Sequence, residues 1–153
     1  MKTIFRFVHL FSLITWFGGV IFFSTLAPVM FKTFPRDQAG DVLGAIFPLF
    51  YKMGYVFGSV ALISLYISTK KKPWFRLLLI GVMLVSTLYG GLVAGKKAGE
   101  LRLQIRQEQD AGQKLVLQEN FHAQHRLSMI SNSLVLIIIP IMTWLTARKI
   151  SDG

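Results

Sequence analysis

Four long apolar runs, separated by charged segments, dominate the hydrophobic pattern of this 153-residue chain. No Asp, Glu, Lys or Arg occurs in residues 7–31, 53–69, 77–95 or 127–147. About 20 apolar residues cross a bilayer core roughly 30 Å thick as an α-helix. The pattern therefore predicts an all-α membrane protein with four transmembrane helices in an antiparallel bundle, folded as a single transmembrane domain over residues 1–153.

Prolines and charges mark the boundaries of these spans. Pro28 should end the first span, because proline cannot donate a backbone hydrogen bond. Pro48 and Lys52 interrupt the second, which leaves either a short interfacial helix before Pro48 or one kinked helix. The first run is too long for the apolar core of a signal peptide, so we expect it to stay in the mature protein. The predicted spans cover residues of about 4–27, 42–69, 74–95 and 123–147.

Residues 96–122, between the third and fourth spans, are polar but rich in helix-forming residues. The turn signal within them is Asp110-Ala111-Gly112. The third and fourth spans are therefore predicted to extend into an outer helical hairpin, which is also a candidate surface for a protein partner. A disordered loop is the alternative, because Gly95 and Gly99 each weaken a helix by about 1 kcal/mol.

The net charge of +10 would indicate a nucleic-acid partner in a soluble protein, but here the charges are grouped by loop. Short cytoplasmic loops of membrane proteins are enriched in Lys and Arg. We therefore expect a multi-pass protein with both termini in the cytoplasm, contacting the lipid bilayer and no nucleic acid. Without cysteine the chain has no disulfide and no thiolate metal site. The basic residues on the predicted inner side are Lys2, Arg6, Lys70, Lys71, Lys72, Arg76, Arg148 and Lys149, with Asp152.

Glycines recur at a spacing of four residues, in the pairs Gly54 and Gly58 and Gly91 and Gly95. In lipid, small residues let helix backbones approach closely, and this contact replaces the hydrophobic effect as the source of packing. Both pairs are candidates for packing within the bundle or for contacts in a homo-oligomer. Chance spacing in a glycine-rich apolar sequence is the third alternative.

The apolar part of the chain carries no carboxylate: no Asp or Glu occurs in residues 42–99 or 120–151. Proton-coupled transporters usually place carboxylates inside the bundle, so the pattern argues against that class. It also leaves no intramembrane acid–base pair, and hydrolase motifs of the Gly-x-Ser-x-Gly or His-Glu-x-x-His type are missing. Enzymatic activity is therefore uncertain and not favoured.

His122, His125 and Met129 share one face of the fourth helix, because they fall at positions i, i+3 and i+7. Imidazole and thioether together suit Cu(I), and imidazole alone suits zinc, copper or haem iron. These three residues are therefore the predicted metal site, at the outer end of the span. The alternative is that the histidines bond water and lipid headgroups while the methionine packs.

Three further polar residues belong to the same region: Lys52, Arg126 and Asn132. Asn132 extends the polar face of the fourth helix inward. A structural network of Lys52 or Arg126 with the two histidines is a third interpretation of this region.

His9 begins a second stripe, which Ser12, Trp16 and Gly19 continue along the first span. It lies near the inner end, about 20 Å in depth from His125, so the three histidines cannot share one metal. His9 and Trp16 are candidates for cofactor binding, with the stripe lining a cavity or holding a haem edge. The alternative is a structural hydrogen bond from His9 to a neighbouring helix.

Several of these residues carry a resemblance to the bacterial family known as domain of unknown function 4149, and to the transmembrane protein 205 family. The resemblance implies a four-helix protein of the bacterial inner membrane without an established activity. The layout also resembles, more distantly, copper-resistance D proteins and the HemJ-type protoporphyrinogen oxidase, which implies copper, or haem or porphyrin at His9. The motifs are Phe7-x-His9-Leu10, Trp16-x-Gly18-Gly19, Ala27-Pro28-Val29-Met30-Phe31, Phe47-Pro48 and Phe121-His122-x-x-His125-Arg126-Leu127-Ser128-Met129.

Three functional hypotheses follow. The first is a membrane protein that binds or passes a metal ion or small solute at its outer end. The second is a haem- or porphyrin-dependent membrane oxidoreductase that uses His9. The third is a non-catalytic assembly partner whose outer hairpin docks another protein.

Overall fold

A computed structural model describes residues 2–151, and helices make up most of them. Four helical rods are long and apolar enough to cross a membrane, the third being continuous from Trp74 to Gln107. The chain is therefore a multi-pass membrane protein, as the apolar runs predict. The elements are α1 (Lys2–Thr33), α2 (Arg36–Ser68), α3 (Trp74–Leu88), the π-helix η1 (Tyr89–Gly95), α4 (Lys96–Gln107) and α5 (Ala111–Ser151).

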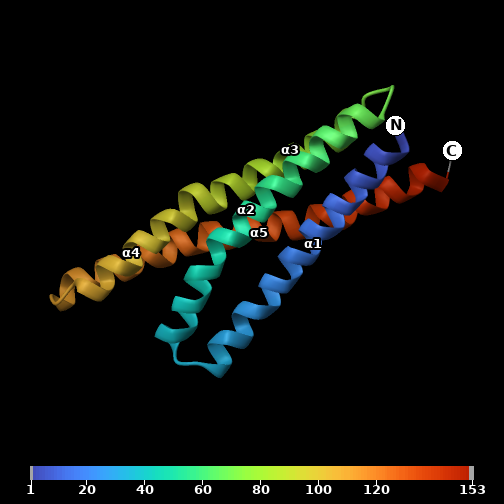
Figure 1. Cartoon of the computed structure of the whole chain (residues 1–153). Coiled ribbons are helices and arrows are strands. Elements are labelled where there is room, and N and C mark those ends of the chain that lie inside the picture. The colour runs from blue at the N-terminus through green and yellow to red at the C-terminus, as the bar shows by residue number, and fades with distance from the viewer. Residues whose placement is uncertain (1, 152–153) are drawn as a thin grey trace.

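The four rods form an antiparallel bundle. α1 packs against α2 and α5, and α3 packs against the same two helices. Both ends of the chain lie beside the α2–α3 turn, at what we call the terminal end of the bundle (Figure 1). The α1–α2 and α4–α5 turns stand apart at the opposite end, the hairpin end (Figure 1). The predicted architecture is confirmed.

Each rod buries one narrow stripe and exposes large apolar side chains elsewhere. On α1, Leu13 is fully buried, whereas Phe7 and Ile14 are more than half exposed. A helix that is apolar all round is typical of a membrane span, because its outer face meets lipid tails. The central core consists of Trp16, Val20, Phe50, Tyr51, Leu65, Ile80, Met83, Val135, Ile139 and Met142.

The prolines do not end helices as the sequence pattern suggests. α1 continues through Pro28 to Thr33, so the prediction that Pro28 ends the first helix is wrong. α2 is one helix through Pro48, which makes the alternative of a separate interfacial helix wrong as well. α5 likewise continues through Pro140. Membrane helices tolerate proline because neighbouring groups and local adjustment satisfy the freed carbonyls.

The helical hairpin at residues 96–122 is present, and the disordered-loop alternative is wrong. α4 ends at Gln107 and α5 begins at Ala111. The Asp110 carboxylate accepts a hydrogen bond from the Gln113 N–H at 2.8 Å, which caps the first turn of α5. The turn precedes the predicted one by two residues, since this cap places Gly112 inside the helix.

The π-helix η1 was not predicted. It lies where glycines of α3–α4 face two tyrosines of α2: a side chain at Gly91 would overlap the Tyr55 hydroxyl and come within 2.6 Å of Tyr51 Cγ. The two tyrosine rings are themselves stacked, with centroids 6.4 Å apart. Single π-helical turns inside α-helices often mark functional or strained positions. Here the glycines give both rings room against the backbone.

The second glycine pair holds the ring of Trp16. A Cβ atom at Gly54 would lie 3.2 Å from Trp16 Nε1, and one at Gly58 would lie 2.9 Å from Trp16 Cη2. Gly91 faces Tyr51 in the same way, whereas a Cβ atom at Gly95 would lie 2.8 Å from the carbonyl oxygen of Gly90 and 3.6 Å from Tyr51 Cε2. Both pairs therefore pack inside one chain, and an oligomer formed through either face would have to displace an aromatic ring.

Gly58→Ala tests this packing. We expect the added methyl group to destabilise the folded protein by about 1–3 kcal/mol, because the indole ring cannot yield as a flexible chain would. The matched control is Gly81→Ala on α3, where an added Cβ meets nothing within 4 Å. The measurement is thermal unfolding in mild detergent. An equal loss of stability in both variants would show that the contact with Trp16 is unimportant.

Candidate functional site

A buried histidine lies near the start of α1. His9 is 2% exposed, and its Nδ1 lies 2.9 Å from the carbonyl oxygen of Ala61 on α2. Because a carbonyl oxygen only accepts hydrogen bonds, Nδ1 must carry a proton, and in the neutral imidazole Nε2 is then an acceptor. Nε2 is buried and has no hydrogen-bond partner among the described residues. The bond to Ala61 agrees with the structural alternative for His9, but half of the imidazole stays unsatisfied.

A buried arginine lies at the same end of the bundle. Arg76 is 9% exposed, in the first turn of α3. Its Nη2 donates to the Thr146 hydroxyl of α5 at 3.1 Å, and that hydroxyl donates to the carbonyl of Met142 at 2.8 Å. The Arg76 Nε is buried without a partner among the described residues. α1 and α3, which carry His9 and Arg76, both pack against α2 and α5.

Hydroxyl groups on α1 and α2 are buried in the same half of the bundle, but each bonds its own helix. Ser12 donates to the carbonyl of Val8 at 2.8 Å, and Ser68 donates to that of Leu65 at 3.2 Å. Neither satisfies the histidine or the arginine. We call the group of His9, Arg76 and Thr146 the terminal-end site. It joins α1, α3 and α5, and the bond to Ala61 adds α2.

Trp16, the other predicted cofactor residue, lies on the same face of α1 as His9 and is 3% exposed. Its ring fills the space above Gly54 and Gly58. A groove of about 400 Å³ runs along the outside of this contact between α1 and α2, lined by aromatic and aliphatic side chains and by Gly18 and Gly19. His9 does not line this groove. Trp16 therefore separates an apolar, lipid-facing groove from the interior.

A second buried polar cluster centres on Tyr51, near the middle of the bundle. The Tyr51 hydroxyl lies 2.7 Å from the Ser128 hydroxyl and accepts a hydrogen bond from Asn132 Nδ2 at 3.2 Å. The predicted polar face of α5 therefore points to a tyrosine of α2. Asn132, one of the predicted polar residues, belongs to this cluster and not to the histidine region.

The predicted metal residues lie on the outside of α5. His122 is exposed, Met129 is 56% exposed, and the half-buried ring of His125 stacks on Phe121 with centroids 5.7 Å apart. No three His, Asp or Glu side chains within residues 2–148 are grouped so that they could hold a metal ion. Any metal here would depend on two imidazoles of one helix and an exposed thioether.

Lys52 and Arg126, the remaining predicted polar residues, are both exposed. Neither forms a hydrogen bond or ion pair with the outer histidines in the described part of the chain. The network that would join them to His122 and His125 therefore stays a prediction.

Ion pairs tie the hairpin to the rest of the bundle. Asp41 near the start of α2 pairs with both Arg102, at 3.2 Å, and Arg106 of α4. Arg102 also donates to the carbonyl of Asp37 at 2.9 Å and lies flat over Gly40, where a Cβ would overlap its guanidinium. These contacts hold α4 against the α1–α2 turn.

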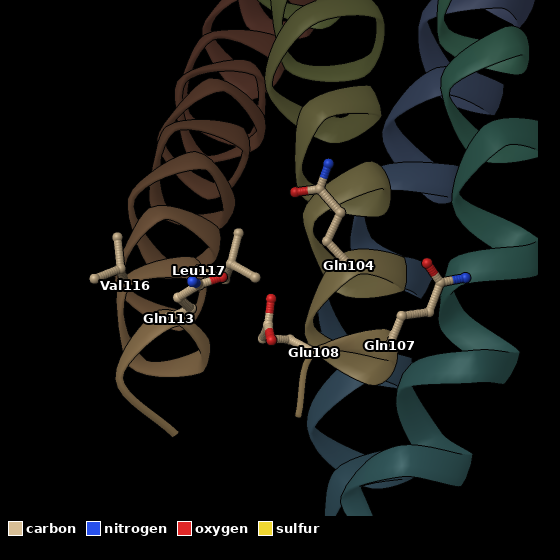
Figure 2. A pocket seen from close by; sticks show the side chains of 6 residues that line it. All are labelled: Gln104, Gln107, Glu108, Gln113, Val116 and Leu117. Carbon is tan, nitrogen blue, oxygen red and sulfur yellow. The ribbon is translucent and has the colours of Figure 1, made fainter. Parts of the chain in front are cut away.

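The tip of the hairpin contains a groove of about 490 Å³ between α4 and α5 (Figure 2). The side chains that line it come from both helices and from the turn: Leu117 and Glu108 point into the space between α4 and α5, whereas Val116 and Gln107 point away from it (Figure 2). Leu103, Leu115 and Val116 in the same part of the hairpin are each more than half exposed. The lining residues are Gln104, Gln107, Glu108, Gln113, Val116 and Leu117.

Comparison with known proteins identifies the family. Residues 11–107 match the family described as a domain of unknown function, DUF4149. The chain belongs to this family. The DUF4149 match contains Trp16, Tyr51 and Arg76, whereas His9 and the outer histidines lie outside it. No curated protein and no solved structure matches the chain. The resemblances to transmembrane protein 205, copper-resistance D and HemJ proteins stay predictions.

Three residues of these clusters, Arg76, Thr146 and Tyr51, were missed by sequence reasoning. In the sequence, Arg76 was considered only as one of the basic residues of a loop, and Tyr51 was not distinguished from the other aromatic residues. A signal for Arg76 is its position two residues beyond the interfacial Trp74, already inside the helix. Tyr51 gives no comparable signal, because the pairing of α2 with α5 cannot be derived from local spacing.

Tyr51→Phe tests the central cluster. We expect a loss of about 1–3 kcal/mol, because removing the hydroxyl leaves the Asn132 amide without its partner in the interior. Tyr55→Phe is the matched control: Tyr55 is half-buried and no hydrogen bond of its hydroxyl is present in the structure. Chemical or thermal unfolding in detergent gives the comparison. Equal stability of Tyr51→Phe and the parent protein would contradict the role of this cluster.

Proposed function

We propose that this member of the DUF4149 family is a membrane protein that binds a small polar solute in the terminal-end site. The observation that carries the proposal is the pair of buried nitrogens, His9 Nε2 and Arg76 Nε, that have no partner among the described residues. A buried polar group without a hydrogen bond costs about 1–3 kcal/mol, and more when it is charged. Both groups lie at one end of the bundle, and the proposal is that a ligand completes their bonding.

The chemistry of the two nitrogens is complementary. Nε2 of His9 accepts a hydrogen bond when Nδ1 is held as the donor to Ala61. The Nε–H of Arg76 can only donate. A solute that presents both a hydroxyl and an acceptor oxygen would satisfy both. The site therefore favours a polar ligand over a hydrocarbon.

The proposed solute site lies at the terminal end of the bundle, and not at the outer end where the sequence predicts it. With the termini in the cytoplasm, as the loop charges predict, the solute would come from the cytoplasmic side. The plasma membrane of a bacterium is the proposed location. The metal hypothesis remains a competing prediction for the outer residues His122, His125 and Met129.

A haem at His9 is supported by one feature, the Nδ1 bond to a backbone carbonyl, which is how metal-bound histidines are commonly oriented. The space around His9 argues against a haem there. Cofactor pockets enclose about 300–1,000 Å³, and His9 lines neither the α1–α2 groove nor the hairpin groove. Leu65, Ile80 and Met142 in this half of the bundle are at most 1% exposed. A porphyrin would have to displace these packed side chains.

Native mass spectrometry of the protein extracted with its surrounding lipid tests the proposal. We expect the wild-type chain to carry a small-molecule adduct that His9→Asn loses. Asparagine can keep the hydrogen bond to Ala61 through its own amide, but it removes Nε2. The adduct should persist in His122→Ala with His125→Ala, the matched histidine control outside the site.

Elemental analysis of the same samples separates this proposal from the outer metal hypothesis. Stoichiometric copper or zinc that disappears in the double variant would favour the outer residues. A wild-type protein without an adduct, or an adduct that His9→Asn retains, would contradict the terminal-end site.

A second candidate function is assembly with another protein through the hairpin. It is favoured by the exposed side chains of Leu103, Leu115 and Val116. Val116 also lines the groove at the tip (Figure 2). Exposed apolar side chains outside a membrane span typically mark interaction surfaces.

Leu115→Glu with Val116→Glu tests the assembly function. We expect the double variant to lose partners that crosslink to the hairpin in intact membranes, while thermal stability changes by less than about 0.5 kcal/mol, since both side chains are exposed. The matched control is Lys114→Glu, beside the patch, which changes the charge without removing apolar surface. Leu78→Glu is unsuitable as a control, because Leu78 faces the membrane. An unchanged crosslinking pattern would exclude this surface.

A further inference from the structure

The terminal-end site holds a permanent positive charge without a described counter-charge. A guanidinium stays protonated in proteins, so Arg76 is a cation at any physiological pH. The ion pairs in the described part of the chain both use Asp41, at the opposite end of the bundle. Residues 42–99 and 120–151 contain no Asp or Glu. The four rods therefore bring no carboxylate to this arginine.

A buried charge of this kind is costly. Taking an ion out of water carries a penalty of several kcal/mol unless an opposite charge and hydrogen bonds compensate for it. The hydroxyl of Thr146 compensates one N–H of Arg76, and it is a neutral partner. A neutral solute would satisfy Nε without balancing the charge. An anion would accept the hydrogen bond from Nε and would also balance the positive charge.

The start of α3 adds to the positive potential. Arg76 lies in its first turn, which contains no acidic residue and has no side-chain cap. The first N–H groups of a helix and its dipole favour negative charge. Lys72 in the preceding turn is a second cation near this end of the bundle. Its ammonium group donates to the carbonyls of Tyr66 and Thr69, at 2.7 and 3.4 Å.

His9 narrows the choice of anion. Its Nε2 is an acceptor at the same end of the bundle as the cation, so a ligand that bonds both residues has to present a hydroxyl as well as a negatively charged oxygen. Hydrogenphosphate has both groups. So does a phospholipid headgroup that combines a phosphodiester with a free hydroxyl. Chloride has neither a donor nor a shape that reaches two nitrogens on different helices.

We propose that the ligand of the terminal-end site is a hydroxyl-bearing phosphate group, held by the guanidinium of Arg76 and by Nε2 of His9. The inference rests on the proposed function, whose site it specifies. Two sources offer the same chemistry, a soluble phosphate compound and an anionic phospholipid.

The test measures thermal unfolding of the full chain in nanodiscs. The first arm uses phosphatidylcholine discs and compares sodium phosphate with sodium chloride at equal ionic strength. The second arm uses discs that contain phosphatidylglycerol, with no added phosphate. We expect stabilisation in at least one arm. Stabilisation in the first identifies a soluble source, and stabilisation confined to the second identifies the lipid.

Arg76→Gln should abolish the stabilisation in the second arm, or raise the half-saturating phosphate concentration at least about tenfold, because a charge-assisted hydrogen bond is lost. Arg148→Gln is the matched control. Arg148 is exposed at the same end, with its guanidinium 5.0 Å from the ring centroid of Trp144. His9→Asn provides a second site variant in case Arg76→Gln does not fold.

Three results would overturn the phosphate assignment. The first is equal stability in phosphate and chloride together with equal stability in both lipids. The second is an equal loss in Arg148→Gln and Arg76→Gln, which would indicate general charge attraction. The third concerns Asp152→Asn without added phosphate. It is a melting temperature below that of the parent protein, with no such difference when both proteins also carry Arg76→Gln. Asp152 lies outside the described residues, and this result would make it the counter-ion.

The mass-spectrometric adduct separates this inference from the proposed function. A neutral adduct that His9→Asn loses would keep the solute site and overturn the phosphate. Absence of both an adduct and any phosphate or lipid effect would overturn the two together.

Discussion

The structure depends on one constraint: a polar group inside a bilayer must find its hydrogen-bond partners within the protein or in a ligand. Every buried hydroxyl among the described residues follows it, through a carbonyl one turn away or through the Tyr51 cluster. Against this background two nitrogens at one end stand out. Their position on different helices makes the terminal-end site a feature of the tertiary structure and not of any one helix.

Packing of the bundle relies on large rings set against glycines. Trp16 against Gly54 and Gly58, and Tyr51 against Gly91, repeat the same arrangement at two depths. Between apolar helices in lipid, this close approach supplies the van der Waals contact that the hydrophobic effect supplies in water. It also explains why a chain with many exposed phenylalanines can still have one defined interior.

How much of this could be predicted depends on the range of the interaction. Charge-free runs identify the four helices, because span length is a local property, and the Asp110 turn could be located to within two residues. Pro28 was wrongly predicted to end a helix and Pro48 left two alternatives open, since rules for helix ends in water do not hold in lipid. The buried stripe through His9 and Trp16 was visible from spacing. The pairing of His9 with Ala61 and of Arg76 with Thr146 was not, because it depends on which helices become neighbours. For the outer histidines, spacing identified a shared face but could not say that this face lies outside the bundle.

The unbroken length of α5 has a mechanical consequence. Its 41 residues span about 60 Å as a single helix, from the Asp110 cap to the terminal end. The surface exposed at the hairpin tip and the Thr146 hydroxyl that holds Arg76 are thus parts of one stiff rod. Pro140, six residues before Thr146, removes one backbone hydrogen bond from that rod. A sideways force on the tip would be transmitted along α5 and would bend it first at this proline, one and a half turns from the arginine's partner.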